Sequence, residues 1–297
     1  MTIFYRRLPK FDYLRPGNLD EAIAALSELE PVRNQVFSGG TDLIPKLKSR
    51  AIKAPAAVID LKGITGLDFV DFSQDHGLRI GANAIIREVA RAECVRTSYA
   101  ALAQGAGLIA SNQLQHRGTI VGNLCNAVPS ADSAPALLAH RAEVVCTGPE
   151  GERVVPLAEF YVTAGVTVLK TREIVREIRV PSPTPGERSV YLKLAGRGRM
   201  DLAVVGVAAA LVIEDGVICK ASIGLGSAAP IPVRATQAEQ ALLGQRITPE
   251  LIQHAATLAM DQSKTRSSHR ASAGYRTDMI GVLTSRALTQ LSQPLNA

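Results

Sequence analysis

Tryptophan is absent from this chain, and aromatic residues make up only 4% of its 297 residues. The formal net charge is +6, but the lysines and arginines are dispersed along the sequence. Nucleic-acid binding would be supported by a basic stripe with interleaved aromatic side chains. We therefore expect no nucleic-acid partner. A basic surface that faces an anionic cofactor or an acidic partner protein explains the charge equally well.

Cysteine is scarce as well. The four cysteines, Cys94, Cys125, Cys146 and Cys219, are scattered and form no C-x-x-C pair. This spacing argues against a zinc ribbon or an iron–sulfur cluster, and the histidines show no metal-ligand spacing either. We expect no metal site in this chain. Because free thiols suit a reducing compartment, we expect a cytoplasmic protein.

Long apolar runs are missing too. The sequence has no stretch of about 18 consecutive apolar residues, so no membrane-spanning helix is expected. The start, MTIFYRRLPKFDYLRP, has two arginines without an apolar segment behind them, so we expect no secretory signal. What is present is an ordinary globular composition, 46% apolar and 20% charged, in a chain long enough for two domains.

Helix and strand signals indicate an α+β fold. Residues 15–29 predict a helix, because Asn18 and Glu21 form a capping-box arrangement before an apolar face. Strand and helix patterns then follow one another as far as a predicted hairpin around Gly148–Gly151.

A cluster of prolines between residues 181 and 185 interrupts this pattern. We place a domain boundary there, between a first domain over 1–178 and a second over 186–297. In the second, Asp215-Gly216 is a favoured type I′ turn between alternating strands. Two helices are predicted to finish the chain, and one face of the last contains Met279, Ile280, Leu283, Ala287 and Leu291.

The first unusual stretch is FSGGTDLIPKLK, residues 37–48. Adjacent Gly39 and Gly40 allow positive φ without steric cost, and successive N–H groups in such a turn can form a nest for an anion. A helix start just after it would favour a nearby anion by roughly 0.3–1 kcal/mol. Two interpretations are open at this point: a plain tight turn, or a turn against which a ligand lies.

A second stretch, HRGTIVGNLCNAVPSAD at residues 116–132, repeats this chemistry. Its small residues allow close backbone approach, and Asp132 could accept a hydrogen bond from a ribose hydroxyl. Further hydrogen bonds are available from Thr119, Asn123, Asn126 and Ser130. Two such loops suit a long, bent ligand with a diphosphate. Neither contains G-x-G-x-x-G or G-x-x-x-x-G-K-[ST], so a Rossmann fingerprint and a P-loop are not supported.

Several stretches in order match one family pattern. FSGGTDLIPKLK, LQHRGTIVGN and NAVPSAD are followed by VTVLKTREIVREIRVP, YLKLAGRGRMDLAVVGVAAAL and ASAGYRTDMIGVLTSRAL. Together they resemble the flavin-binding subunit of the molybdenum hydroxylase family, which includes xanthine dehydrogenase and carbon monoxide dehydrogenase. That family has A-G-G-T/H-D/S-L, then I-R-N-R-G-T-I-G-G-N-L, then S-P-A-x-D. The resemblance covers nearly the whole chain.

The resemblance implies a fold. An FAD-binding domain of the vanillyl-alcohol-oxidase/MurB (PCMH) type would be followed by a C-terminal α+β domain with a three-stranded sheet and helices. The FAD-binding domain would consist of a small N-terminal lobe, about residues 1–57, and a larger lobe, about residues 58–178.

The resemblance also implies which residues bind FAD. The diphosphate would be wrapped by Ser38, Gly39, Gly40, Thr41 and Asp42. A second phosphate loop would contain Thr119, Gly122 and Asn123. Asn126 and Asp132 would reach the ribityl or ribose hydroxyls, Ile174 and Val175 would line the adenine or flavin, and Lys193 would lie near the flavin. Two further cofactor contacts are expected from Leu43 and Ile109.

One position departs from the family pattern. Val121 stands where T-I-G-G-N has a glycine, and valine is poorly suited to positive φ. Either its side chain points away from the cofactor, or the loop is slightly displaced. The chain also lacks the Cys-rich insertion that holds an iron–sulfur cluster in a minority of relatives, so we expect no cluster in it.

Two basic segments admit two interpretations each. HRASAGYR, residues 269–276, suits an anion site, but the resemblance favours a structural start of the last helix. RGR, residues 197–199, is either a solvated turn or a lid or partner contact near the flavin.

The implied function is that of the medium, FAD-carrying subunit of a heterotrimeric molybdenum hydroxylase. Substrate would be oxidised at a molybdopterin cofactor in a large subunit. Electrons would pass through two [2Fe-2S] clusters in a small subunit to FAD, and then to an external acceptor. A dimer of heterotrimers is expected. We predict no catalytic residue in this chain, because the isoalloxazine does the redox chemistry.

Two alternatives stay open. A self-contained flavin oxidoreductase of the same fold would turn over its own substrate when purified alone. A binding or assembly module that kept the fold and lost the cofactor would show no flavin absorption. In the favoured interpretation the substrate site lies in another chain, so the residues of this chain do not specify the substrate.

Overall fold

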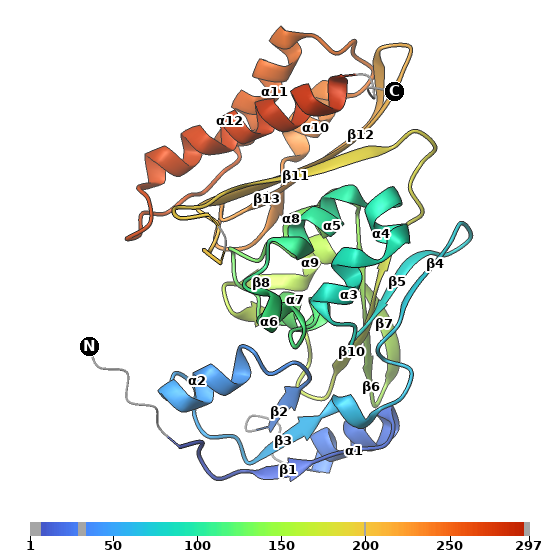
Figure 1. Cartoon of the computed structure of the whole chain (residues 1–297), viewed down its shortest axis with the longest axis vertical. Helices are drawn as coiled ribbons and strands as arrows, with labels where there is room; N and C mark the ends of the chain where they lie inside the picture. Colours follow the sequence, from blue (N-terminus) through green and yellow to red (C-terminus); the bar gives the residue numbers. More distant parts are fainter. Residues whose placement is uncertain (1–6, 29–33, 199, 294–297) are drawn as a thin grey trace.

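The computed structural model describes residues 7–28, 34–198 and 200–293. Three layers of sheet follow one another along the long axis of the molecule (Figure 1). A three-stranded sheet lies nearest the N-terminus, a five-stranded sheet occupies the middle, and a four-stranded sheet lies below the last helices. This mixed α/β arrangement confirms the predicted fold class.

The N-terminal lobe is a small parallel sheet with strand order β1-β3-β2. Its elements are β1 (Asp12–Leu14), α1 (Leu19–Glu28), β2 (Asn34–Phe37), α2 (Leu43–Ser49) and β3 (Ala57–Asp60). The predicted cap is present in a variant form: the Glu21 N–H donates to Asn18 Oδ1 at 2.9 Å, while the Glu21 carboxylate accepts from the Asn18 side-chain Nδ2 at 2.8 Å and from the Gly17 N–H at 2.7 Å. Helix α1 thus begins where the sequence predicted it.

The middle region is an antiparallel sheet of strand order β4-β5-β10-β6-β7, with short helices beside it. The strands are β4 (Val70–Ser73), β5 (Gly77–Gly81), β6 (Glu143–Gly148), β7 (Gly151–Pro156) and β10 (Ile174–Val180). The helices are α3 (Ile86–Arg91), α4 (Glu93–Ser98), α5 (Ala100–Gly107), α6 (Asn112–Gln115), α7 (Ile120–Cys125), α8 (Ser133–Ala139) and α9 (Leu157–Phe160). A short hairpin adds β8 (Tyr161–Thr163) and β9 (Val166–Thr167), and a 3-10 turn spans Leu61–Gly63. The β6–β7 pairing confirms the hairpin predicted around Gly148–Gly151.

The C-terminal sheet has strand order β11-β12-β13-β14. Its strands are β11 (Arg188–Leu194), β12 (Val205–Glu214), β13 (Val217–Gly226) and β14 (Val233–Arg234). Helices α10 (Thr236–Leu242) and α12 (Ala273–Ser292) pack on it, and α11 (Pro249–Asp261) packs against both of these helices. We expected three strands and two helices; the fourth strand has only two residues, and α10 is a further helix.

The hairpin between β12 and β13 turns at the predicted dipeptide. Asp215 and Gly216 have φ of 51° and 77°, as a type I′ turn requires. On the last helix, Ile280, Leu283 and Ala287 are buried, as the apolar face predicted.

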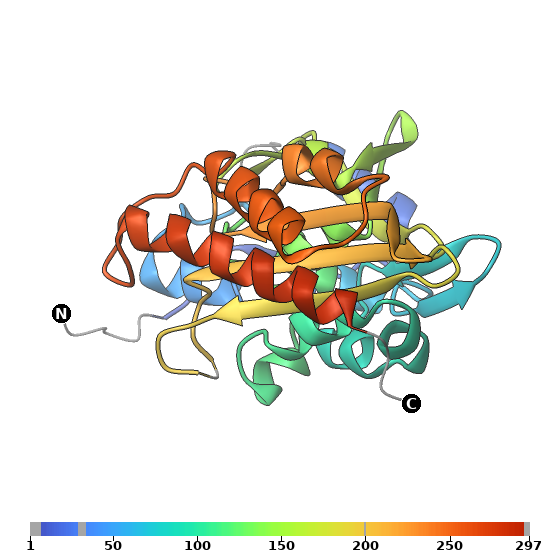
Figure 2. The same cartoon turned by 90° about the horizontal axis from the view of Figure 1, so that it is seen from above.

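The C-terminal sheet is buried on both faces. Along β12, Ala208 and Ala210 belong to the apolar core of the middle region, whereas Ala209 and Leu211 belong to the core below α10–α12. Figure 2 shows the helices lying across the outer face. On the inner face a Cβ at Gly224 would lie 2.1 Å from the carbonyl oxygen of Pro135, so β13 and α8 meet backbone to backbone.

The segment between β10 and β11 contains the proline cluster and joins the middle and C-terminal regions. At the end of this segment the Glu187 carboxylate is buried between the side chains of His140 and Lys220. His140 Nδ1 lies 3.3 Å from Glu187 Oε1, and Lys220 Nζ lies 2.6 Å from Glu187 Oε2. The other ring nitrogen of His140 lies 3.1 Å from Ser189 Oγ. We call these four side chains the junction cluster.

All four cysteines are free. Within the described ranges, no helix is both long enough and apolar enough to cross a membrane. The same residues contain no group of three histidine, cysteine or acidic side chains placed to hold a metal ion.

Candidate functional site

The two glycine-bearing stretches lie against each other. A Cβ at Gly39 would lie 2.2 Å from the carbonyl oxygen of Arg117 and 2.7 Å from Cα of Gly118. Only glycine permits this approach, because real Cβ atoms do not come so close to a neighbouring backbone. A second link is a hydrogen bond from Asn126 Nδ2 to Asp42 Oδ1 at 2.8 Å.

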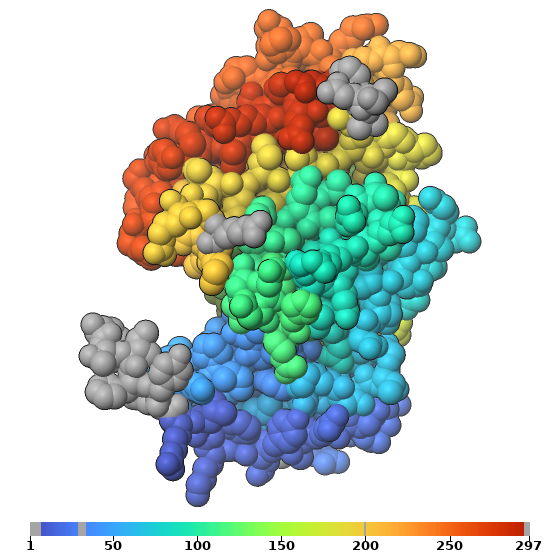
Figure 3. Space-filling view, in the orientation of Figure 1, coloured from blue at the N-terminus to red at the C-terminus, as the bar shows by residue number. Residues whose placement is uncertain are grey.

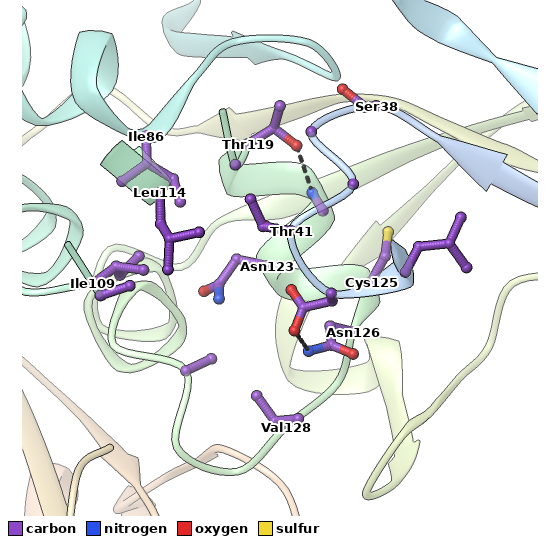
Figure 4. A pocket seen from close by; sticks show the side chains of 18 of the residues that line it. Ser38, Thr41, Ile86, Ile109, Leu114, Thr119, Asn123, Cys125, Asn126 and Val128 are labelled. Carbon is purple, nitrogen blue, oxygen red and sulfur yellow. Dashed lines mark hydrogen bonds between the residues drawn. The ribbon is translucent and has the colours of Figure 1, made fainter. Parts of the chain in front are cut away.

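A cavity of about 570 Å³ opens where these stretches meet. Its outline is visible as the indented side of the molecule, where the N-terminal lobe (blue) meets the middle region (green) in Figure 3. Twelve of the fifteen residues predicted from the sequence line it: Ser38, Gly39, Gly40, Thr41, Asp42, Leu43, Ile109, Thr119, Gly122, Asn123, Asn126 and Asp132. Figure 4 shows the labelled ones among these side chains around the open space.

The turn at residues 38–42 leaves backbone groups free for a ligand. Gly40 has a φ of 72°, a backbone conformation that residues other than glycine rarely adopt. Gly39 and Thr41 form no hydrogen bond within the described part of the chain. Ser38 is held from outside, because its hydroxyl donates to Asn83 Oδ1 at 2.7 Å. The turn is therefore fixed in place while its N–H groups remain available to an anion.

Positive charge reaches the same place. Lys46 on α2 lines the cavity, and its ammonium donates to Asn126 Oδ1. Desolvation raises the pKa of the Asp42 carboxyl, while Lys46 and the hydrogen bond from Asn126 oppose that rise. The Asp42–Asn126–Lys46 chain of contacts ties α2 to the end of α7, so the two sides of the cavity keep their separation.

The second stretch is partly helical rather than a loop. Residues 120–125 form α7, and the Thr119 hydroxyl caps it by accepting from the Gly122 N–H at 3.0 Å (Figure 4). Gly122 also lines the cavity, so its lack of a side chain keeps this helix surface open. The glycines suggested a loop, whereas the threonine cap was the local signal for a helix start.

Val121 lies inside this helix. It does not adopt positive φ, and its side chain is only 6% exposed, packed in the core of the middle region. Of the two alternatives stated above, the first therefore applies: the side chain points away from the cavity.

We expect Thr119→Ala to destabilise the protein by about 1 kcal/mol, the usual cost of losing a threonine helix cap. The variant should also retain less bound ligand, because α7 forms one wall of the cavity. Thr119→Ser keeps the capping hydroxyl and should behave as the wild type. Chemical denaturation of both variants measures the free energy of unfolding. An equal loss of stability in Thr119→Ala and Thr119→Ser would contradict a capping role for the hydroxyl.

Asp132, in the cavity wall, belongs to a buried polar network. Asp132 accepts from the Tyr191 hydroxyl at 2.7 Å and from Lys193 Nζ at 2.8 Å. Burial raises the pKa of Asp132, whereas Lys193 and the two hydrogen bonds lower it. Lys193 also donates to the carbonyl oxygen of Leu108 at 3.3 Å. The network fixes the orientation of Asp132 at the cavity wall.

Three predicted site residues do not line the cavity. Lys193 stands behind Asp132, with 5% of its side chain exposed. Ile174 and Val175 are 2% and 4% exposed within the core of the middle region. Their contact with a cofactor stays a prediction.

Other lining residues had no signal in the sequence. Ile86 and Leu114 add an apolar wall, Gly165 comes from the turn between β8 and β9, and residues 200–202 come from the loop between β11 and β12. In this loop Arg197 pairs with Asp201 at 3.4 Å, whereas Arg199, part of the RGR segment, lies outside the described residues. Only folding brings these segments to one cavity.

Cys125 lines the cavity as well. Burial raises the pKa of its thiol to about 12. A thiol with so high a pKa stays protonated near neutral pH and is a poor nucleophile. The side chain therefore serves as a small packing group there.

The arrangement suits an elongated ligand with an anionic centre. The glycine turn offers free N–H groups, Asn123 and Asn126 offer amides, and the apolar wall at Ile86 and Ile109 can receive a ring system. The carboxylates in the cavity wall already have protein partners: Asp42 accepts from Asn126, and Asp132 accepts from Tyr191 and Lys193. The geometry favours binding a cofactor over proton-transfer chemistry.

The chain matches two known domain families. Residues 9–183 match the family described as the FAD binding domain in molybdopterin dehydrogenase. Residues 190–291 match the CO dehydrogenase flavoprotein C-terminal domain.

Relatives match over most of their length. The carbon monoxide dehydrogenase medium chain of Hydrogenophaga pseudoflava is 31% identical over 280 residues, which are 94% of this chain and 96% of the relative. The xanthine dehydrogenase FAD-binding subunit of Escherichia coli O157:H7 is 28% identical over 94% of each chain. The solved carbon monoxide dehydrogenase from H. pseudoflava superposes with a TM-score of 0.91 at 33% identity, covering 95% of this chain and 97% of that one.

Proposed function

The chain belongs to the FAD-binding medium subunits of the molybdenum hydroxylase family, and we propose that it passes electrons from the [2Fe-2S] clusters of a partner subunit through FAD to an external acceptor. The oxidation of substrate takes place at a molybdopterin cofactor in a third, large subunit. The assembly is a dimer of heterotrimers in the cytoplasm.

The observation that supports this proposal is the fit of the cavity to FAD. At Gly39 and Gly118 a side chain would fill the space between the two stretches, and the turn beside them leaves Gly39 and Thr41 without a hydrogen bond to any described residue. A diphosphate needs this combination of close backbone approach and free donors. The volume, about 570 Å³, lies within the range of small-molecule and cofactor sites.

Each part of the cavity then has a role. Residues 38–42 and 119–123 hold the diphosphate, while Asn126 and Asp132 face the hydroxyls of the ribityl or ribose. Lys46 adds positive charge beside the diphosphate. Lys193, fixed by Asp132 and the Leu108 carbonyl, lies near the flavin.

FAD, when bound, accepts and donates both single electrons and pairs, which suits transfer between iron–sulfur clusters and a two-electron acceptor. The protein contributes position and environment. Ser38, held by Asn83, keeps the glycine turn in place, and the apolar wall at Ile86, Ile109 and Leu114 excludes water from one side. No side chain of this subunit needs to move a proton from the substrate, since the substrate is bound elsewhere.

The test is to purify the chain alone and with its two partner subunits. Alone, it should bind FAD stoichiometrically, show flavin absorption and turn over no substrate. With the partners, reduction of the flavin should follow reduction of the [2Fe-2S] clusters. Turnover by the chain alone would favour the self-contained flavin oxidoreductase. Failure to bind added FAD would favour the assembly module without a cofactor.

A further inference from the structure

The loop that leads into α12 concentrates positive charge outside the cavity. Between Gln262 and Thr277 the sequence has four lysines and arginines and no acidic residue: Lys264, Arg266, Arg270 and Arg276. The loop lies at the N-terminal end of α12 (red), opposite the C-terminus of the chain in Figure 2. This part of the chain is separate in sequence from both glycine-bearing stretches.

Arg276 is buried there without a counter-charge. Only 4% of it is exposed. One terminal nitrogen of its guanidinium donates to the Val204 carbonyl, and the other donates to Ser268 Oγ at 2.8 Å. Its Nε has no partner, and no carboxylate in the described part of the chain pairs with it. A buried charge with neutral partners alone is unfavourable, because desolvation is not repaid by an opposite charge.

Arg270 is tied to the same hydroxyl: its backbone N–H donates to Ser268 Oγ at 3.2 Å, and Arg276 donates to that oxygen too. Burial lowers the pKa of the Arg276 guanidinium, and the charges of Arg270 and Arg266 lower it further. Neither Arg266 nor Arg270 has a carboxylate partner within the described ranges, and Nε of Arg270 is buried and unpaired. The first turn of α12 has no acidic residue, and the helix dipole adds positive potential.

We propose that Arg266, Arg270 and Arg276 form a binding site for an oxyanion of the phosphate class, either free phosphate or the phosphate of a nucleotide. Guanidinium groups match phosphate oxygens with paired, charge-assisted hydrogen bonds, and an anion here supplies the missing counter-charge. The HRASAGYR segment is therefore both the start of α12 and part of a site.

The position of this site links it to the cavity. Arg276 binds the carbonyl of Val204, and Leu202, two residues earlier, lines the cavity. An anion at the arginines thus steadies the loop between β11 and β12. The inference does not depend on the proposed electron transfer, because it rests on the arginines alone.

The experiment is calorimetric titration of the full 297-residue chain, in buffer free of phosphate and sulfate, with inorganic phosphate and separately with AMP. Arg266→Ala/Arg270→Ala should weaken binding about tenfold or more, since two charge-assisted contacts are lost. Arg246→Ala/Arg286→Ala removes the same charge from exposed positions elsewhere and should bind as the wild type. A separate binding step whose affinity is the same in wild type and Arg266→Ala/Arg270→Ala belongs to the cavity, because neither of these arginines lines it.

The two probes identify the source of the anion. Tighter binding of AMP than of phosphate assigns the site to a nucleotide, and equal binding assigns it to free phosphate. Absence of saturable binding of both probes, or equal binding by wild type and Arg266→Ala/Arg270→Ala, would overturn the proposal.

Thermal unfolding separates this role from a purely structural one. In anion-free buffer, Arg266→Ala/Arg270→Ala should unfold at a temperature no lower than the wild type, because like charges have been removed. A lower unfolding temperature for that variant would mean that these arginines stabilise the fold by themselves, against the proposal. FAD content, measured on the same samples, reports the proposed function independently.

Discussion

Gly39→Ala should yield a folded protein that has lost its flavin. The new Cβ would lie 2.2 Å from the Arg117 carbonyl oxygen and 2.7 Å from Cα of Gly118, so the two stretches must separate. Both contacts are backbone atoms, which cannot move aside as a flexible side chain would. Displacing the turn breaks the alignment of its donors, and misplacing two or three charge-assisted hydrogen bonds, each worth about 1.5–3 kcal/mol, weakens FAD binding at least about a hundredfold.

The measurement is flavin absorption per chain after purification, followed by titration of the apoprotein with FAD. Gly107→Ala is the matched control, since a Cβ there meets no atom within 4 Å and Gly107 lies at the end of helix α5. Circular dichroism should show that both variants are folded. Normal FAD content in Gly39→Ala would show that the turn does not hold the diphosphate.

Glu187→Gln should cause the largest loss of stability among the polar substitutions considered. Only 4% of the Glu187 side chain is exposed. Burial alone would raise the pKa of this carboxyl, but hydrogen bonds from His140 and Lys220, with their charges, bring it down from the ordinary 4.5 to about 2. A depression of this size corresponds to about 3 kcal/mol of folding free energy at neutral pH.

The sign of the pH dependence follows from that pKa. Because the folded pKa lies below the unfolded one, the stabilisation is complete above about pH 4.5 and is lost as the pH falls towards 2. The stability difference between wild type and Glu187→Gln should therefore shrink over this range. Urea unfolding at several pH values measures it, and a difference that stays constant from pH 7 to the acid limit would refute the assignment.

Glu150→Gln provides the control for Glu187→Gln. Glu150 pairs with Lys170 at 2.9 Å, but 84% of its side chain is exposed. Exposed pairs contribute at most about 1 kcal/mol, so this variant should remain close to the wild type at every pH. A larger loss of stability in Glu187→Gln than in Glu150→Gln would show that burial of the ion pair causes the difference. It also shows how firmly the junction cluster joins the middle region to the C-terminal sheet.

Local patterns predicted the elements whose signals are complete within a few residues. The capping box at Asn18 and Glu21, the turn at Asp215-Gly216 and the apolar face of α12 all appear in the structure. The α7 helix was missed as a helix because its glycines were interpreted as loop residues. The hydrogen bond from the Gly122 N–H to Thr119 Oγ1 shows that the threonine was the better signal.

Long-range contacts had no such signals. Nothing near Glu187 indicates His140 or Lys220 as its partners, and nothing near Leu202 indicates that it lines the cavity. The spacing in HRASAGYR did not reveal that Arg276 is buried with no carboxylate partner among the residues that the structure describes. These facts depend on which elements pack together.

The sequence by itself determined the family, the fold class and the two glycine-bearing stretches, because motif order and backbone conformation are local properties of the chain. Only the tertiary structure decided that Gly39 lies against Gly118, that Val121 is directed into the core, and that Arg276 is buried beside Ser268. The reason is physical: these features depend on distances between atoms far apart along the chain, which packing alone sets.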